Sequence, residues 1–402
     1  MSLTARAKYF ILLGVVLIMS GCSRRPVVGI LLATSGDIGT YGQAMKKAID
    51  LAVEEAKADG TYPANLELVW ADSKSDPKTA EQEFRTMVSK HGAKLVIAGV
   101  TSDEIRDLLP VFEQTDTVCL SPSASAPILT KEGEFFYRLF ASDDLEGRRA
   151  GRFLYEDWNK KSVLIYAGDN EQTRGIEPPF RQIFEQALGG KVVGKVAIAD
   201  PDWEKQSADL LAAHNPESVY IIDYAAETLK VLRHLRQHGY KGIICVTSAF
   251  ASGEVIRKEP DLVEGVYFPQ PAFDVLDEQE HVQRFVKAYR AKYKSDPDIY
   301  AAHAYDAMRL VMFVVKQTPV FVTQNIKKTL AFGLSEFPGV TGTIQFNEYG
   351  DVAHNPIMFI IKDGQVRNYE RWVKEEKERI RREIGRLLGR RMAAPVPTPA
   401  PE

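Results

Sequence analysis

The stretch that most constrains the fold of this chain is a strand–helix–strand pattern over residues 95–129. Residues 95–98 and 117–120 are short apolar runs bounded by turn residues, which is typical of buried strands in a parallel sheet. Between them, apolar residues recur at helical spacing over residues 105–112, which predicts an amphipathic connecting helix. The loops that leave the two strands are therefore expected at the same carboxyl edge of a sheet.

Both of these loops are rich in hydroxyl groups. Thr101 and Ser102 stand at the predicted helix start, and the second loop carries Ser121, Ser123 and Ser125. Hydroxyls and free backbone N–H groups at a helix start bind small anions such as a carboxylate. Ser102 by itself is better explained as a helix N-cap. Two hydroxyl-rich loops at one sheet edge make a ligand site an equally good explanation.

The alternation of strands and helices continues along the chain, which is typical of open parallel sheets. Further strands of the first sheet are predicted at residues 27–33 and 66–70. Strands of a second sheet are predicted at residues 162–166, 192–198, 218–222, 242–246 and 265–268. Long helices are then predicted, and the final strands, residues 342–346 and 357–361, resemble a hairpin-like pair.

These patterns predict an α/β protein with two Rossmann-like lobes, each built on a parallel sheet, and a ligand cleft between the lobes. We assign residues 27–143 plus 272–337 to lobe 1, and residues 144–271 plus 338–369 to lobe 2. Cys119 and Cys245 then fall in different lobes. Two separate buried thiols are therefore a better explanation than a disulfide, although an oxidising compartment allows one.

The N-terminus has the pattern of a secretory signal. Basic residues precede an apolar run over residues 9–19, which is shorter than the ~20 apolar residues that span a bilayer. Residues 19–22, Met-Ser-Gly-Cys, resemble the bacterial lipobox, in which the cysteine, here Cys22, is acylated. We expect a signal peptide over residues 1–21, a lipidated tether over residues 22–26, and a location on the periplasmic side of a bacterial membrane. The alternative is an ordinary cleaved signal with an incidental cysteine.

The C-terminus differs in composition from the lobes. Residues 370–392 predict a charged helix with a narrow apolar stripe, which either docks a partner or is a solvated extension. Residues 393–402 are rich in proline and alanine and predict a disordered tail.

Several function classes find no support. The net charge of −3 gives no nucleic-acid footprint. His234 and His238 lie four apart on a helical stretch but lack a third ligand, so no metal or cofactor is expected. Acidic residues such as Asp306 are not paired with a nucleophile, so we expect no enzyme and interpret Asp306 as structural.

Five segments together carry a family likeness. They are GILLATSGDIGTYGQAMKKAIDLAVEEA, VIAGVTSDE, LSPSASAPIL, DPDIYAAHAYDAM and GVTGTIQFNEYGDV, in this order. Over residues 27–369 the chain resembles the leucine/isoleucine/valine-binding proteins, the type I periplasmic solute-binding proteins that serve ABC transporters. The resemblance implies a small carboxylate or amino-acid ligand, an ABC permease as partner, and closure of two lobes about a hinge.

The resemblance also implies roles for single residues. Ser102 resembles the hydroxyl that binds the ligand carboxylate, and Ser123 resembles the residue whose carbonyl receives the ligand ammonium. Ser125 stands where the family often has a threonine that contacts both groups. Tyr41 and Tyr224 resemble pocket aromatics from the first and second lobes, although each fits equally well as a core or rim aromatic.

One departure concerns the ligand's amine. The family often has an acidic residue just after the strand at residues 242–246, where it pairs with the ammonium, whereas this chain has the neutral Ser248 there. Asp223, beside Tyr224, is a candidate substitute. If Asp223 points into the cleft, the ligand is an amino acid; if it does not, a carboxylate without an amine is favoured.

Two functions compete on this fold. The first is a lipid-anchored binding protein that captures a small carboxylate, of the branched-chain amino-acid type, for ABC import. The second is a ligand-sensing or regulatory lipoprotein that acts on a partner protein, which the charged C-terminal helix and proline-rich tail favour.

The lipobox generates a first prediction. Substituting Cys22→Ala should release the protein into the soluble fraction or leave the precursor uncleaved, because the acylated thiol is then missing. Fractionation of cells with detection of the protein measures this. Wild-type protein found entirely in the soluble fraction contradicts the expectation.

Overall fold

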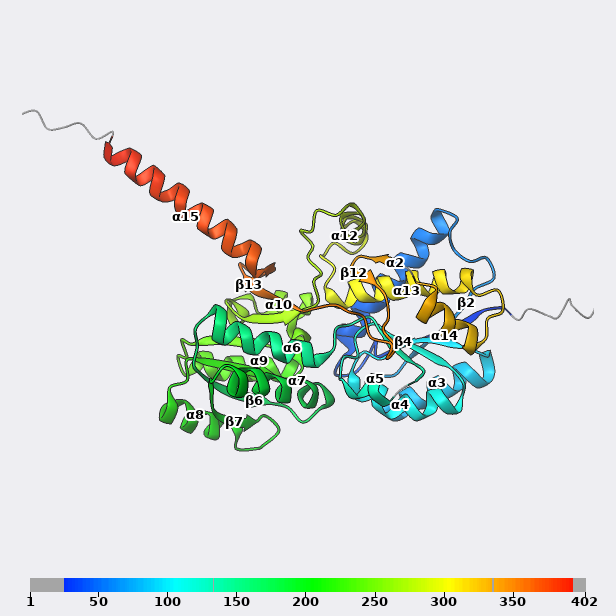
Figure 1. Ribbon diagram of the computed structural model, residues 1–402, viewed down its shortest axis with the longest axis horizontal. Helices are drawn as coiled ribbons and strands as arrows, with labels where there is room; N and C mark the ends of the chain where they lie inside the picture. The colour runs from blue at the N-terminus through cyan, green and yellow to red at the C-terminus, as the bar shows by residue number, and fades with distance from the viewer. Residues whose placement is uncertain (1–24, 133, 335, 393–402) are drawn as a thin grey trace, which may run out of the picture. The chain divides into compact units, whose positions relative to one another are not determined.

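The structure is a computed structural model that describes residues 25–132, 134–334 and 336–392 (Figure 1). The predicted signal peptide with Cys22 and the predicted tail at residues 393–402 lie outside the described residues. The chain forms two compact units. Unit 1 contains the chain up to residue 142 and residues 279–354, and unit 2 contains residues 143–278 and the chain from residue 355 onward. Among the described helices, none is both long and apolar enough to cross a membrane.

Unit 1 is built on a five-stranded parallel sheet in the order β2-β1-β3-β4-β5. Its strands are β1 (Val27–Leu32), β2 (Glu67–Asp72), β3 (Leu95–Ala98), β4 (Val118–Ser121) and β5 (Phe136–Arg138). Every residue of β1, β3 and β4 is buried, which explains their continuous apolar sequences. The predicted strand–helix–strand unit is confirmed as β3, α4 and β4, with β3 and β4 adjacent and parallel.

The helices of unit 1 begin and end where the sequence provides caps. Asp76 accepts a hydrogen bond from Thr79 N (2.8 Å) ahead of Pro77, and Gly92 ends the same helix at φ +75°. The helices are α2 (Gly39–Ala58), α3 (Pro77–His91), α4 (Ser102–Gln114), α5 (Ile128–Glu132), α12 (Glu280–Tyr293), α13 (Ile299–Gln317) and α14 (Thr323–Phe332). The strands β11 (Phe337–Gly339) and β12 (Gly342–Ile344) form a small antiparallel pair.

Unit 2 is built on a seven-stranded sheet in the order β14-β13-β10-β9-β8-β6-β7. Five strands are parallel: β6 (Ser162–Ala167), β7 (Lys191–Ala197), β8 (Ser218–Ile222), β9 (Ile243–Val246) and β10 (Tyr267–Gln270). The antiparallel strands β13 (Ile357–Lys362) and β14 (Gln365–Asn368) complete one edge. The prediction of an α/β protein with two parallel-sheet lobes is confirmed.

The helices of unit 2 include two that end in a π-helical turn, at Phe153–Asp157 and Gln182–Ala187. The α-helices of unit 2 are α6 (Asp143–Arg152), α7 (Glu171–Arg181), α8 (Trp203–His214), α9 (Ala225–Gln237), α10 (Gly253–Lys258), α11 (Pro260–Val263) and α15 (Tyr369–Met392). Gly147 brings α6 close to α7, because a Cβ there would lie 2.3 Å from Ile176 O. The first turn of α15 packs Tyr369 and Trp372 on the core of unit 2, whereas Ile380 and Ile384 are exposed.

The final strands do not form the expected hairpin. β12 pairs with β11 in unit 1, whereas β13 pairs with β10 and β14 in unit 2. The contacts also group residues 338–354 with unit 1 and residues 272–278 with unit 2, where the sequence pattern suggests the reverse. The physical reason for the first difference is a buried carboxylate, that of Asp306 on α13.

Asp306 is fully buried and holds the turn between β11 and β12. Its Oδ1 accepts from Val340 N (2.9 Å), and its Oδ2 accepts from Thr341 N (2.9 Å) and Thr341 Oγ1 (2.8 Å). Arg309 Nη1 lies 3.5 Å from Oδ1. This agrees with the structural role expected for Asp306, and it attaches the segment after β11 to α13.

We predict that Asp306→Ala lowers the free energy of unfolding by about 3 kcal/mol, because three buried donors lose their acceptor. Denaturant unfolding followed by circular dichroism measures this. Asp107→Ala, on the exposed face of α4, is the matched control and should change stability by less than about 0.5 kcal/mol. Equal effects of the two substitutions contradict the proposed role of Asp306.

Candidate functional site

The start of α4 is capped by Thr101, not by Ser102. Thr101 Oγ1 accepts from Glu104 N (3.5 Å), and Glu104 Oε2 accepts from Thr101 N (3.4 Å), which together form a capping box. Glu104 is also buried against Ser73, whose Oγ donates to Glu104 Oε1 (2.6 Å). Ser102 is therefore the first residue of α4, and its side chain is available for another role.

The hydroxyl of Ser102 joins the two serine-rich loops of unit 1. Its Oγ accepts hydrogen bonds from Ser125 N (3.0 Å) and Ala126 N (3.0 Å), and the residue is only 3% exposed. Because a hydroxyl has two lone pairs and one proton, these bonds occupy its acceptor capacity and leave the O–H to donate. The two loops therefore meet, as their place at one sheet edge predicts.

Ser121 and Ser123 use their hydroxyls within unit 1. Ser123 Oγ donates to Val100 O (2.8 Å) and lies 3.1 Å from Gly99 O. Ser121 Oγ lies 3.2 Å from Gly99 O and accepts from Ala124 N (3.0 Å). The hydroxyl of Ser123 thus fixes the loop, which is compatible with a ligand role for its carbonyl, the group that the family resemblance implies.

Arg138 at the end of β5 is a supporting residue that sequence reasoning missed. It is 1% exposed, and its Nη1 donates to Ser125 O and to Ala126 O (2.9 Å). Its Nε donates to Asp351 Oδ1, which ties the loop to a residue far along the chain. Both backbone polar groups of Ser125 are thereby engaged, so the Ser125 hydroxyl is its group best placed to serve a ligand. A basic residue inside a short apolar strand was the available signal.

Tyr41 lies in the first turn of α2 and is 5% exposed. Its ring meets the ring of Tyr300 edge-on, with centroids 4.8 Å apart, and Tyr300 stacks on Phe140. Tyr41 therefore belongs to an aromatic cluster with Tyr300 and Phe140.

In unit 2, Asp223 braces the loops that follow three neighbouring strands. Asp223 Oδ1 accepts from Asn170 Nδ2 (2.8 Å) and Tyr224 N (2.8 Å), and Asp223 O accepts from Thr247 Oγ1 (3.1 Å). Asp223 is 5% exposed, and the half-buried Tyr224 beside it is the N-terminal flank of α9. The structure therefore brings Asp223, Tyr224 and the segment after β9 together at one sheet edge.

Ser248 is bonded to an acid that comes from another element. Glu146 on α6 accepts from Ser248 N at Oε1 (2.8 Å) and from Ser248 Oγ at Oε2 (2.6 Å). Glu146 is 3% exposed and lies on the buried face of α6, otherwise lined by small residues and Asp143. Sequence reasoning missed Glu146 because it precedes Ser248 by about a hundred positions. The one available signal was a carboxylate on the small-residue face of a predicted helix.

The charge of Glu146 is disfavoured in this setting. Burial, followed by the nearby negative charge of Asp143, raises the pKa of Glu146 to about 8, and the two hydrogen bonds from Ser248 oppose the rise only in part. The carboxyl group therefore holds its proton through the neutral range.

Other candidates from the sequence have structural explanations. His238 Nδ1 lies 2.9 Å from His234 O, and within the described ranges no three His, Cys, Asp or Glu side chains are grouped to hold a metal ion. Cys119 and Cys245 are buried free thiols in different units, and burial raises the pKa of both.

Comparison with known proteins decides the family. Residues 27–365 match the family model described as periplasmic binding protein. The chain belongs to the periplasmic binding protein family. This match covers both units and both groups of site residues.

The chain is also similar to individual binding proteins. The chain is 24% identical over 321 residues to a leucine-, isoleucine-, valine-, threonine- and alanine-binding protein of Pseudomonas aeruginosa, covering 79% of this chain and 84% of the relative. It is 22% identical over 333 residues to the Leu/Ile/Val-binding protein of Escherichia coli, covering 81% and 87%.

Several solved structures share the fold. A leucine-binding protein of Thermotoga maritima has a TM-score of 0.78 at 23% identity, covering 85% of this chain and 97% of that one. A branched-chain amino-acid substrate-binding protein of Streptococcus pneumoniae, solved with isoleucine, has a TM-score of 0.76 at 25% identity with the same coverage. A solute-binding protein from R. palustris, solved with benzoate, has a TM-score of 0.75 at 22% identity, covering 85% and 95%.

The buried position of Glu146 generates a prediction for stability. The unfolded chain releases this proton near the ordinary value of 4.5, whereas the folded protein keeps it until about pH 8. The folded state then binds more protons over this window, so the free energy of unfolding should fall as the pH rises from about 4.5 to 8. Glu146→Gln should flatten this part of the profile and raise stability at pH 8 by roughly 1–4 kcal/mol.

Urea unfolding from pH 5 to pH 8 measures the effect. Glu156→Gln, in the following π-helical turn, is the matched control because Glu156 makes an exposed ion pair with Arg152. A profile that stays parallel to the wild type in Glu146→Gln contradicts the assigned protonation of Glu146.

Proposed function

We propose that this protein is a lipid-anchored, extracytoplasmic solute-binding protein that captures a small carboxylate ligand by hinge closure and delivers it to an ABC permease. The family match over residues 27–365 supports the class of function. Relatives named as leucine-, isoleucine- and valine-binding proteins support an amino acid of the branched-chain type as the ligand. Anchorage through Cys22 is supported by the lipobox pattern alone, and Cys22 lies outside the described residues.

The observation that carries the proposal is the bonding of Ser102. Its hydroxyl stands in the first turn of α4 and keeps its proton for donation, because both lone pairs are used by Ser125 N and Ala126 N. The partial positive charge of the helix start adds to its attraction for an anion. We assign the ligand carboxylate to Ser102 and the Ser125 hydroxyl, with Tyr41 lining the same end of unit 1.

The amine of an amino-acid ligand needs an acceptor from the protein, because a buried unpaired ammonium is costly. We assign this role to the edge of unit 2 formed by Asp223, Tyr224 and Ser248. Two acids are available there, since Asp223 lies directly beside Tyr224 and Glu146 is bonded to Ser248. An ammonium beside Glu146 favours loss of its proton, because an opposite charge lowers the pKa of a carboxyl group.

A carboxylate without an amine is the second candidate ligand. The neutral Ser248 and the raised pKa of Glu146 support it, because a protonated acid offers no charge to an ammonium. The R. palustris protein solved with benzoate, which shares the fold, supports this candidate. A regulatory role on the same fold gains no support from the relatives, and we propose no catalytic role.

Calorimetry with leucine, its keto acid and benzoate tests the proposal. Wild-type protein should bind at least one of them, and Ser102→Ala should weaken that ligand by roughly 1.5–3 kcal/mol, because a hydrogen bond to a charged group is lost. Ser207→Ala is the matched control, since Ser207 is also a buried serine but bonds Tyr166 Oη in unit 2 (2.6 Å). Undiminished binding by Ser102→Ala removes Ser102 from the site.

The same titrations identify the acceptor of the amine. If Asp223 holds the ammonium, Asp223→Ala should weaken leucine and leave the keto acid unchanged, and Glu146→Gln should do so if Glu146 holds it. Binding of the keto acid or benzoate without leucine supports the second candidate. Wild-type protein that binds none of the three contradicts the proposed ligand class.

A further inference from the structure

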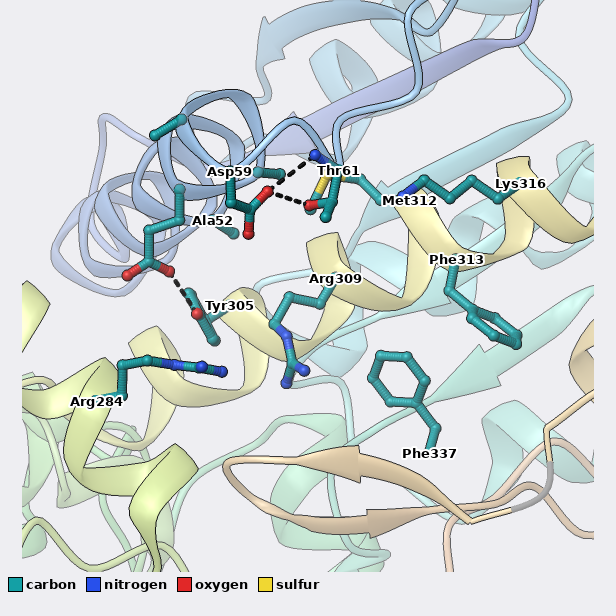
Figure 2. A pocket seen from close by; sticks show the side chains of 13 residues that line it. Ala52, Asp59, Thr61, Arg284, Tyr305, Arg309, Met312, Phe313, Lys316 and Phe337 are labelled. Carbon is teal, nitrogen blue, oxygen red and sulfur yellow. Dashed lines mark hydrogen bonds between the residues drawn. The ribbon is translucent and has the colours of Figure 1, made fainter.

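Unit 1 contains a cavity of about 590 Å³ that no proposed ligand contact uses. It is lined by the last two turns of α2, by α13 and β11, and by Arg284 near the start of α12 (Figure 2). Its volume is in the range of sites for small organic molecules.

The cavity lies towards the far end of α2 from the serine-rich loops. This helix starts with Tyr41 in its first turn, just after the carboxyl end of β1, and ends next to Asp59, which lines the cavity. The lining residue of α2 nearest to Tyr41 is Ala52, 11 positions or about 16 Å along the helix. The cavity therefore lies towards the opposite edge of the sheet from Ser102.

One wall of the cavity is aromatic. The rings of Phe313 and Phe337 meet edge-on with centroids 5.5 Å apart, and Figure 2 shows them facing each other. The guanidinium carbon of Arg309 lies 5.3 Å from the Phe337 ring and 5.7 Å from the Tyr305 ring. An apolar or aromatic body can pack against this wall, with a cation held at its side.

The two carboxylates in the lining are already engaged by protein donors. Glu55 Oε2 accepts from Tyr305 Oη (2.5 Å), and Asp59 Oδ1 accepts from Thr61 N (2.9 Å) and Thr61 Oγ1 (2.5 Å). The bonds from Thr61 are the main cause that lowers the pKa of Asp59, and the charges of Lys316 and Arg284 add to it. Both cations line the cavity together with Asp59.

The cations are less engaged than the acids. Arg309 Nη1 donates to Pro338 O (2.9 Å) and lies near Asp306. Arg284 and Lys316 are exposed, and no hydrogen bond or ion pair within the described ranges uses their end groups. The cavity therefore presents two cationic donors beside an aromatic wall, at opposite sides of Arg309 (Figure 2).

We propose that this cavity is a second binding site, for a small organic carboxylate with an aromatic or bulky apolar body. The carboxylate pairs with Arg284 on one side of Arg309 or with Lys316 on the other (Figure 2), and the body packs on Phe313 and Phe337. The proposal stands independently of the ligand proposed at the serine-rich loops, because none of the residues is shared.

Saturation-transfer NMR and calorimetry with 3-phenylpropionate test the site on the full chain. Wild-type protein should bind this probe, and 3-phenylpropan-1-ol, 3-phenylpropylamine and propionate should bind more weakly, since each lacks the charge or the ring. Arg284→Ala with Lys316→Ala should weaken 3-phenylpropionate about fivefold, because the partly exposed ion pair is lost on either side of Arg309. Lys287→Ala with Lys328→Ala, two exposed lysines outside the cavity, is the charge-matched control and should have no effect.

A third variant separates this site from the one at the serines. Ser102→Ala should leave the binding of 3-phenylpropionate in the cavity unchanged. If Ser102→Ala loses the binding of 3-phenylpropionate while the Arg284/Lys316 variant binds it as the wild type does, the probe binds at the serine-rich loops. That outcome overturns the proposal. Absence of binding to wild-type protein, or equal binding of the alcohol and the carboxylate, overturns it as well.

Discussion

The candidate site of unit 1 depends on the two hydrogen bonds that the Ser102 hydroxyl accepts from backbone N–H groups. It joins the loop after β3 to the loop after β4, and Arg138 secures the carbonyls of the same two residues, Ser125 and Ala126. These hydrogen bonds hold the two loops in place before a ligand binds. Binding then orders fewer groups, which reduces its entropic cost. The Ser102 O–H remains as a donor whose direction is fixed in advance.

Features of this structure that depend on neighbouring residues in the sequence are predicted well, whereas those that depend on residues far apart in the sequence are not. The strands β3 and β4 and the helix between them follow from local apolar runs and periodicity. The cap of α4 was harder to assign, because Thr101 and Ser102 are adjacent and both are good N-cap residues. The partners of the loops, Arg138 and Asp351, come from elsewhere in the chain, so no local pattern specifies them.

The same distinction explains the last strands. Residues 342–346 and 357–361 both have strand-like sequences, and proximity in the chain suggested that they pair. The pairing is instead decided by Asp306, whose carboxylate holds Val340 and Thr341 in unit 1, and by β10, whose free edge takes β13 in unit 2. Local propensity fixes that a strand forms, whereas a buried side chain and an open sheet edge decide where it pairs.

The buried carboxylates differ in how much they are stabilised as anions, and this difference bears on the ligand. Asp306 accepts three bonds and has Arg309 nearby, and these oppose in part the rise that burial causes in its pKa. Glu146 accepts two bonds from one serine and faces the charge of Asp143, so its proton is retained. A cation that binds beside Glu146 balances the negative charge of its ionised carboxylate, which the surrounding protein groups do only in part. The energy of that contact is then reduced by the cost of releasing the proton, whereas a ligand without an amine avoids this cost. In the function proposed above, Glu146 is therefore the acid whose proton sets the balance between amino acids and simple carboxylates if it, and not Asp223, receives the amine.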